Sequence, residues 1–502
     1  MKSELKIGSI LSVFSIILNS LISIFYTPMY MRYLGTTDYG INSLVQSIMG
    51  YIGMLNLGLG SAMVRYTVRY RTEGKLEEEK SLNGMFLVIF SIIMLISIFI
   101  GAYIYYSLPN MFAEKFTVEE LIKTRKVFVI TMAGTAVSFP VSVFSTNISS
   151  RERFLYQRVL GLLKMIITPI AGAILMVNGF GIVAVVSVTI ILGLITNVFD
   201  VIYAFKIGMR LKFKNFDFEI LKDISKYSFY IFLNIIIDRV YWGTDRIIIG
   251  KFIGPLAVGI YSIASVFNNI YMSLSTAISG VLFPRINKLV VEEKYNYLSD
   301  MFIRIGRIQY ILLGLISSGF IIFGNEFIYL WLGKGYTEVY KIALWIMIPL
   351  TIPLIQNTGI AIMQARNQHQ FRSVVYFFIA ILNIVVSILL VKNYGTIGCA
   401  IATGISFTLG NIIIINIYYW KRVDIDIPLF WVNIFKMSIP VAITMVIGYG
   451  LNHFINEYRI VTFILKGSIY VVIYVILMWL IGMNKEEKIE ILKPIKKYLI
   501  KY

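Results

Sequence analysis

Five residues at helical spacing stand out in an otherwise apolar stretch near the middle of the chain: Asp238, Arg239, Trp242, Asp245 and Arg246. Seven residues make almost two turns of an α-helix, so the acids stack on one line and the arginines on the next, roughly 10 Å apart along the axis. The indole falls three residues after one arginine and four before the other, within reach of a cation-π contact. The pattern predicts a polar stripe on one face of a helix.

The chemistry of this stripe depends on its surroundings. A charge at the centre of a bilayer costs at least about 2.5 kcal/mol, so these side chains must face a polar interior. A planar guanidinium matches phosphate oxygens better than a point charge does. We therefore take Arg239, Arg246 and Trp242 as candidate substrate-binding residues, and Asp238 and Asp245 as candidates for coupling or gating. The alternative is that these charges pair across helices and only hold the bundle together, although a pairing that differs between two states serves both roles.

Further polar side chains within apolar stretches could line the same space. These additional candidates for substrate binding are Asn19, Gln46, Lys164 and Asn234. Taken singly, such a residue is more often an interhelical hydrogen-bonding group. Asn19 precedes Asp238 by 219 residues, which is also the spacing of an internal repeat. One half of the chain therefore carries a neutral group where the other carries an acid.

Signals for catalysis or metal binding are poor. His369 and His453 fall on opposite predicted sides of the membrane, so no histidine pair is available for acid-base chemistry or for a metal. Asp424-x-Asp426 imitates the metal motif of sugar-nucleotide enzymes but lies in a short loop without a nucleotide fold around it. Cys399 is the only cysteine, which excludes an intramolecular disulfide and a thiolate cluster. We expect no enzyme activity, no cofactor and no metal site.

The elements that position these residues are membrane spans. The 502-residue chain is 58% hydrophobic, its mean hydropathy is +0.78, and its apolar runs repeatedly exceed the 18 or so residues that span a bilayer. No loop is long enough to be a soluble domain. The sequence predicts an all-α polytopic membrane protein with about 14 transmembrane helices, near residues 7–31, 40–64, 82–106, 126–148, 156–177, 181–205, 227–250, 255–281, 305–325, 342–364, 372–391, 396–420, 433–453 and 460–482.

The first half of the chain is repeated in the second. Arg32-Tyr-Leu-Gly35 through Leu44 and Lys251-Phe-Ile-Gly254 through Ile263 share the pattern [RK]-[YF]-[LI]-G-x4-G-I-x-S-[LI], 219 residues apart. Six spans per copy return the chain to its starting side, so the two copies share one orientation. The repeat predicts an N-terminal lobe at 1–206, a linker at 207–222, a C-terminal lobe at 223–420, an added helix pair at 433–483 and an amphipathic tail at 484–502.

The net charge of +19 lies mainly on alternate loops. Groups such as Arg65 to Lys80, Arg151 to Arg158 and Lys206 to Lys222 fall on one side of the predicted membrane, and roughly a third as many cations fall on the other. By the positive-inside rule both termini are cytoplasmic. The basic excess therefore indicates topology and contact with anionic lipids at the cytoplasmic face, and it argues against nucleic-acid binding.

Two segments carry a resemblance to a known family. Lys251-Phe-Ile-Gly254-x4-Gly259-Ile-Tyr-Ser-Ile-Ala264 and Leu282-Phe-Pro-Arg-Ile286, set in two six-helix lobes plus a helix pair, resemble the Wzx-type oligosaccharide flippases of the multidrug, oligosaccharidyl-lipid and polysaccharide exporter superfamily. The resemblance implies a transporter in a bacterial-type plasma membrane that flips polyprenyl-pyrophosphate-linked oligosaccharide from the inner to the outer leaflet by alternating access. It also implies surface-polysaccharide polymerases and glycosyltransferases as partners.

Other functions remain open at this point. A lipid II flippase of the same superfamily resembles the same architecture and also prefers a cationic cavity. A multidrug or cation antiporter of the superfamily would be expected to carry an acid in the first span, where this chain has Asn19. A membrane-embedded glycan polymerase or acyltransferase would need catalytic residues on sizeable outer loops. For coupling to a proton, a sodium ion or the membrane potential, Asp238 is the best candidate because it lies at mid-depth beside Arg239.

Overall fold

The computed structural model describes residues 2–489, apart from residues 215, 217, 281–285, 287, 291, 293, 367 and 456. The described elements are helices, in the order α1 (Lys2–Tyr33), α2 (Gly35–Gly53), η1 (Met54–Asn56), α3 (Leu59–Thr72), α4 (Leu76–Phe112), α5 (Val118–Ser150), α6 (Phe154–Val177), α7 (Ile182–Lys206), α8 (Phe218–Phe252), α9 (Pro255–Gly280), α11 (Tyr295–Leu332), α12 (Thr337–Ile355), α13 (Asn357–Ala365), α14 (His369–Phe407), η2 (Thr408–Ile415), α15 (Asn416–Arg422), α16 (Ile427–Phe454), α17 (Ile460–Leu477) and η3 (Met478–Gly482).

The all-helical, multi-pass architecture confirms the predicted fold class. Twelve stretches within the described residues are long and apolar enough to cross a membrane. The stretch Gln370–Arg422 contains two predicted spans, because the backbone of Gly395 turns out of helical geometry at φ 60° and ψ −143° inside α14. The predicted span 227–250 lies within α8.

The internal repeat is visible in the backbone. Gly35 separates α1 from α2 with φ +82°, and Gly254 separates α8 from α9 with φ +129°. A second pair behaves in the same way: Gly179 has φ +80° and Gly395 has φ +60°. Glycine adopts positive φ without the steric penalty of a Cβ atom. The repeated glycines thus turn the chain between successive helices in both halves.

The chain divides into two compact units. Unit 1 comprises Met1–Ser262 with Val391–Thr396, and unit 2 comprises Ile263–Leu390 with Ile397–Tyr502. The boundary falls within α9, so α8 packs with unit 1, where it contacts α2 and α3. The lobe boundaries that the repeat predicts remain a prediction.

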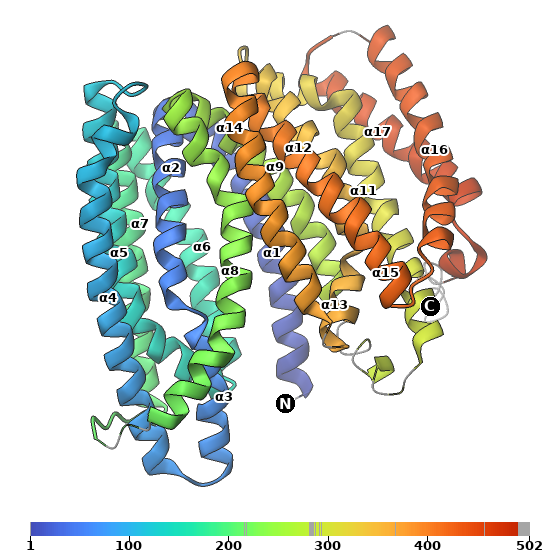
Figure 1. Ribbon diagram of the computed structural model, residues 1–502. Helices are drawn as coiled ribbons and strands as arrows, with labels where there is room; N and C mark the ends of the chain where they lie inside the picture. The colour runs from blue at the N-terminus through green and yellow to red at the C-terminus, as the bar shows by residue number, and fades with distance from the viewer. Residues whose placement is uncertain are drawn as a thin grey trace, which may run out of the picture. The chain divides into compact units, whose positions relative to one another are not determined.

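In unit 1, α5 packs against both α4 and α7, and α1 packs against α6 (Figure 1). The core between α3, α4 and α5 is apolar and fully buried, as at Phe86, Phe90 and Val143. The start of α2 meets the start of α9 at the second glycine of each repeat motif. A Cβ atom added at Gly40 would lie 1.8 Å from the carbonyl oxygen of Pro255, and one added at Gly259 would lie 2.2 Å from that of Thr36. Only residues without a side chain permit this approach.

In unit 2, α11 packs against α12, α16 and α17. Two buried ion pairs join α11 to the C-terminal helix pair. Nζ of Lys466 lies 2.6 Å from Oε2 of Glu326, and Nε of Arg307 lies 2.6 Å from Oε1 of Glu487. Glu487 belongs to the predicted amphipathic tail, whose residues from 490 onward lie outside the described part of the chain. The helix pair and the first residues of the tail are therefore fixed to α11.

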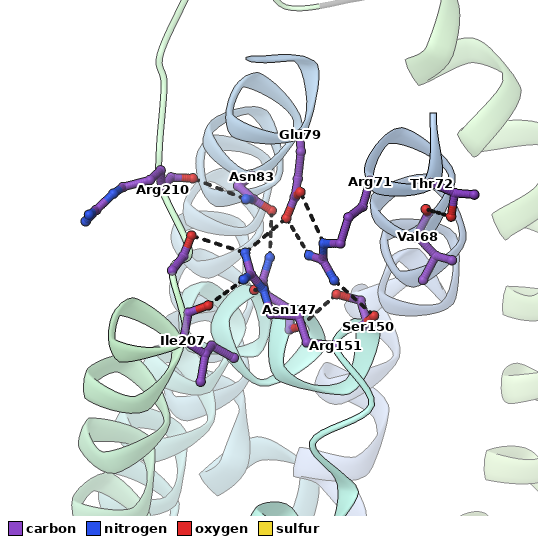
Figure 2. A network of polar contacts seen from close by, with 11 residues as sticks. Val68, Arg71, Thr72, Glu79, Asn83, Asn147, Ser150, Arg151, Ile207 and Arg210 are labelled. Carbon is purple, nitrogen blue, oxygen red and sulfur yellow. Dashed lines mark hydrogen bonds and ion pairs between the residues drawn. The ribbon is translucent and has the colours of Figure 1, made fainter. Parts of the chain in front are cut away.

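A polar network closes one end of unit 1 (Figure 2). Oε1 of Glu79, at the start of α4, lies 2.5 Å from Arg71 at the end of α3 and 3.2 Å from Arg151 after α5. Arg151 also donates to the carbonyl oxygens of Ile207 and Gly208, at 2.5 and 3.2 Å. One buried carboxylate thus joins three helix ends to the segment that follows α7.

Replacing Glu79 by glutamine should lower the stability of the protein by about 2–3 kcal/mol, because two partly buried guanidinium groups lose their counter-charge. The measurement is the apparent melting temperature of the purified protein in detergent. Glu78→Gln is the matched control, since Glu78 is the exposed neighbour of Glu79. Equal melting temperatures for the two variants would contradict the role of the network.

Candidate functional site

A pocket of about 420 Å³ opens within unit 1. Its walls come from α1, α2, α6 and α7, and its lining residues are Asn19, Ile22, Tyr26, Tyr30, Asn42, Gln46, Gly161, Lys164, Met165, Thr168, Pro169, Val185, Val186, Thr189 and Ile190. The structure therefore brings together three of the predicted site residues, Asn19, Gln46 and Lys164, from three different helices. Volumes of 300 to 1,000 Å³ are typical of small-molecule sites.

Lys164 supplies the positive charge of this pocket. Its Nζ lies close to Gly193 on α7, where an added Cβ atom would be 3.4 Å away. Asp200, further along α7, acts on it electrostatically. Among the described residues, Lys164 forms no hydrogen bond and no ion pair within 4 Å. An ammonium group without a close counter-ion inside an apolar bundle attracts an anionic group.

Three polar atoms of the lining are buried and have no hydrogen-bond partner among the described residues: Oη of Tyr30, Oδ1 of Asn42 and Oγ1 of Thr168. Tyr30 is only 3% exposed. A buried polar group without a partner costs about 1–3 kcal/mol. Three such groups around one cavity indicate a site that is completed by a polar ligand.

Local helix chemistry shapes the pocket wall. Pro169 lies inside α6 and lines the pocket, as does Met165 one turn earlier. Because proline has no N–H, the carbonyl of Met165 lacks its helical donor. On the α1 side the rings of Tyr26 and Tyr30 are 6.0 Å apart, and Tyr30 meets Tyr39 of α2 at 5.1 Å. These edge-to-face contacts fix the tyrosines where they line the cavity.

The predicted stripe on α8 divides into two kinds of residue. Asp245 is 3% exposed and accepts a short hydrogen bond from the hydroxyl of Tyr261 on α9. Arg246 donates to Oγ of Ser262 at 3.1 Å and to the carbonyl of Trp242 at 3.3 Å. These contacts join α8 to the repeat motif at the start of α9, so this part of the stripe holds helices together.

The other half of the stripe is open. Asp238 and Arg239 are both exposed. A guanidinium nitrogen of Arg239 lies against Gly50 of α2, 3.2 Å from where a Cβ atom would be. Tyr51 reaches the same part of α8, with its hydroxyl 3.4 Å from the carbonyl of Arg239. The side chain of Asn234, the remaining predicted site residue, lies outside the described part of the chain.

Sequence reasoning missed the uncharged members of the pocket. Tyr30, Asn42 and Thr168 are common residue types in membrane helices, and no spacing distinguishes them. A partial signal exists for Asn42, because it lies inside the repeat motif at the position that Tyr261 occupies in the second copy. The sequence has different chemistry at one position of the two copies, and that difference marks the pocket side of α2.

Comparison with solved structures identifies the fold. A lipid II flippase MurJ in an inward closed conformation aligns with a TM-score of 0.74 and 18% identity, covering 94% of this chain and 97% of MurJ. An inward-facing multidrug resistance MATE family transporter of the MOP superfamily aligns with a TM-score of 0.61 and 16% identity, covering 83% of this chain and 98% of that one. At these identities the likeness defines the class: an all-helical membrane protein with the fold of the exporter superfamily named above.

Sequence comparison gives the family. Residues 5–290, more than half of the chain, match the family described as "Polysaccharide biosynthesis protein". The chain belongs to this family, which confirms the predicted resemblance and the prediction that the chain is not an enzyme.

Two curated proteins of Haloferax volcanii are also similar. "Probable flippase AglR" is 31% identical over 203 residues, 38% of this chain and 41% of that protein. "Probable low-salt glycan biosynthesis flippase Agl15" is 25% identical over 215 residues, 41% of this chain and 44% of that protein. The matched part thus spans about two fifths of the length of these curated relatives.

Removing the hydroxyl of Tyr261 and removing that of Tyr30 should have opposite consequences. Tyr261→Phe leaves the buried carboxylate of Asp245 without this donor and should lower stability by about 1–3 kcal/mol. Tyr30→Phe removes a hydroxyl that has no partner among the described residues, and should leave stability unchanged or raise it. Melting temperatures of both variants in detergent check this, since both residues are buried in unit 1. Similar losses for the two variants would contradict the assignment of Tyr30 to a ligand site.

Proposed function

We propose that this protein is a flippase for lipid-linked glycan, and that the unit 1 pocket binds the phosphate-bearing part of its substrate. The observation that carries the proposal is the cation of Lys164 in a cavity where Tyr30, Asn42 and Thr168 each present a buried polar atom without a partner among the described residues. A phosphate supplies negative charge and several acceptor oxygens, whereas the hydroxyls of tyrosine and threonine supply donors. The names of the curated relatives agree with this function.

The substrate that this chemistry fits is a polyprenyl-pyrophosphate-linked oligosaccharide. A cavity of about 420 Å³ takes one charged headgroup and leaves the lipid and most of the glycan outside. Arg239 is exposed on α8 and carries a planar donor fork, so we assign it a second contact with the pyrophosphate. Arg246 shares that charge but is held by Ser262, and we assign it to orienting α8.

In this proposal the protein lies in the plasma membrane with both termini in the cytoplasm, and it moves the substrate from the inner to the outer leaflet by alternating access. Anionic lipids meet the basic cytoplasmic loops, and polysaccharide polymerase and glycosyltransferases act before and after it. A lipid II flippase would present the same pyrophosphate chemistry to the pocket, so the substrate itself must be the variable in the test.

Lys164→Met should lower the flipping rate roughly 10- to 100-fold, the value of one lost charge-assisted hydrogen bond. Lys164→Arg should keep most of the activity, because it keeps the charge. The measurement is transfer of a fluorescent polyprenyl-pyrophosphate glycan between leaflets of proteoliposomes at equal protein content, with lipid II measured in parallel.

Lys126→Met is the control for this experiment, since it removes one positive charge from an exposed position on α5 of the same unit. Wild-type rates for Lys164→Met would overturn the role of the pocket. Faster transfer of lipid II than of the oligosaccharide would replace the substrate in the proposal and keep the site.

Coupling is assigned to Asp238, which is exposed beside Arg239, and not to Asp245, which is buried against Tyr261. Asp238→Asn should abolish the acceleration of transfer by an imposed proton or sodium gradient. The response to voltage should remain, because about 2.3 kcal/mol per charge per 100 mV acts on the anionic substrate itself. Asp245→Asn should respond to each gradient as the wild type does. Identical responses of Asp238→Asn and wild type would show that Asp238 is not the coupling group.

A further inference from the structure

A second pocket lies in unit 2, remote in sequence from the residues assigned above. It has a volume of about 400 Å³ and is formed by the end of α11, the loop that leads into α12 and the connection between α16 and α17. Its polar and aromatic lining is Asn325, Tyr329, Lys334, Thr337 and Tyr458. The distribution of basic loops predicts that this end of unit 2 faces the side opposite to the cytoplasm.

The lining combines aromatic faces with hydrogen-bonding groups. The rings of Tyr329 and Tyr458 meet edge to face, with centroids 5.2 Å apart and an interplanar angle of 76°. They remain 37% and 46% exposed, so their faces are available to a ligand. A pyranose ring has an apolar C–H face and an edge of hydroxyls, which suits an aromatic wall beside an amide and a hydroxyl. Asn325 and Thr337 supply that amide and hydroxyl.

The floor of the pocket is free of side chains. Gly333 and Gly335 flank Lys334 and have φ +93° and +103°, which favours glycine. A Cβ atom added at either glycine would meet no atom within 4 Å. Lys334 is therefore the charged group of the pocket lining, and it favours a ligand that carries an acidic group.

The walls are held rigid by the buried ion pair next to them. Lys466 donates to Glu326 at 2.6 Å, to Oδ1 of Asn452 at 3.0 Å and to the carbonyl of Ile455 at 3.1 Å. This single ammonium joins α11, the end of α16 and the loop that carries Tyr458. On the other side, the hydroxyl of Tyr340 donates to the carbonyl of Ile321 at 2.6 Å and fixes α12 to α11. Walls that are ordered before binding reduce its entropic cost.

We propose that this pocket binds a saccharide, and preferentially one that carries a carboxylate. Its volume admits one or two sugar rings. The inference goes beyond the proposed function, because soluble sugars test it without any transport. In a lipid-linked glycan flippase, such a pocket would hold the glycan on the side to which it is delivered.

Another explanation of the two tyrosines is the aromatic belt that anchors membrane proteins at the interface. A belt residue contacts lipid headgroups and needs no amide, no hydroxyl and no cavity beside it. In the pocket all of these converge with the two rings. The two explanations give different results with soluble ligands.

The test uses the full-length protein in lipid nanodiscs and saturation-transfer NMR with methyl β-D-glucuronide and methyl β-D-glucoside. We expect saturable transfer to the glucuronide and weaker binding of the glucoside. Tyr458→Leu and Tyr329→Leu should each weaken glucuronide binding roughly tenfold. Lys334→Gln should remove the preference for the glucuronide and leave the glucoside unaffected.

Tyr449→Leu and Lys341→Gln are the matched controls, because they replace exposed residues of unit 2 outside the pocket. Both should bind as the wild type does. Absence of saturable binding for both glycosides in the wild type overturns the proposal, as does equal binding by pocket and control variants. Binding of glycerol 1-phosphate, but of neither glycoside, would instead assign the pocket to a lipid headgroup.

Discussion

The structure depends on one constraint: within a hydrocarbon layer, a polar group must find its partner inside the protein. The buried charges of unit 2 meet this constraint in pairs. Lys466 has Glu326, Asn452 and a carbonyl as partners, and Arg307 has both oxygens of Glu487. Each pair ties elements that lie far apart in the chain, so the same bonds that satisfy the charges also set the packing of the helix pair. The unit 1 pocket departs from this rule, and the departure marks it as a site for a ligand.

The features that sequence reasoning predicted well are those with a period or a strict steric requirement. Spans follow from the length of apolar runs, and Gly35 and Gly254 are required wherever the backbone needs positive φ. Partners could not be predicted, because they depend on packing between distant segments. Arg307 and Glu487 are 180 residues apart, and no local pattern connects them. Likewise, Asp238 and Asp245 are equivalent on a helical wheel, and only the position of Tyr261 makes one of them structural.

The segment between the halves of the repeat is more ordered than its composition suggests. The N–H of Lys212 donates to the carbonyl of Lys80 at 3.0 Å, and the side-chain amide of Asn83 donates to the carbonyl of Arg210 at 3.1 Å. A Cβ atom added at Gly84 would lie 2.1 Å from the carbonyl oxygen of Lys212. Residues 207–212 of the predicted linker therefore move with unit 1, and any bending between the halves must take place after Lys212.

The contact between Gly40 and Gly259 also has a history. Each glycine lies at the same place in one copy of the repeat, and each approaches the backbone that precedes its counterpart. Such a contact is isologous: the same patch serves as both surfaces, as at the twofold axis of a homodimer. A single-copy ancestor with the R-Y-L-G-x4-G motif could form it by self-association in one orientation, because one glycine per chain suffices. Fusion of two copies would then make a symmetric dimer permanent, and each half would be free to diverge away from that point.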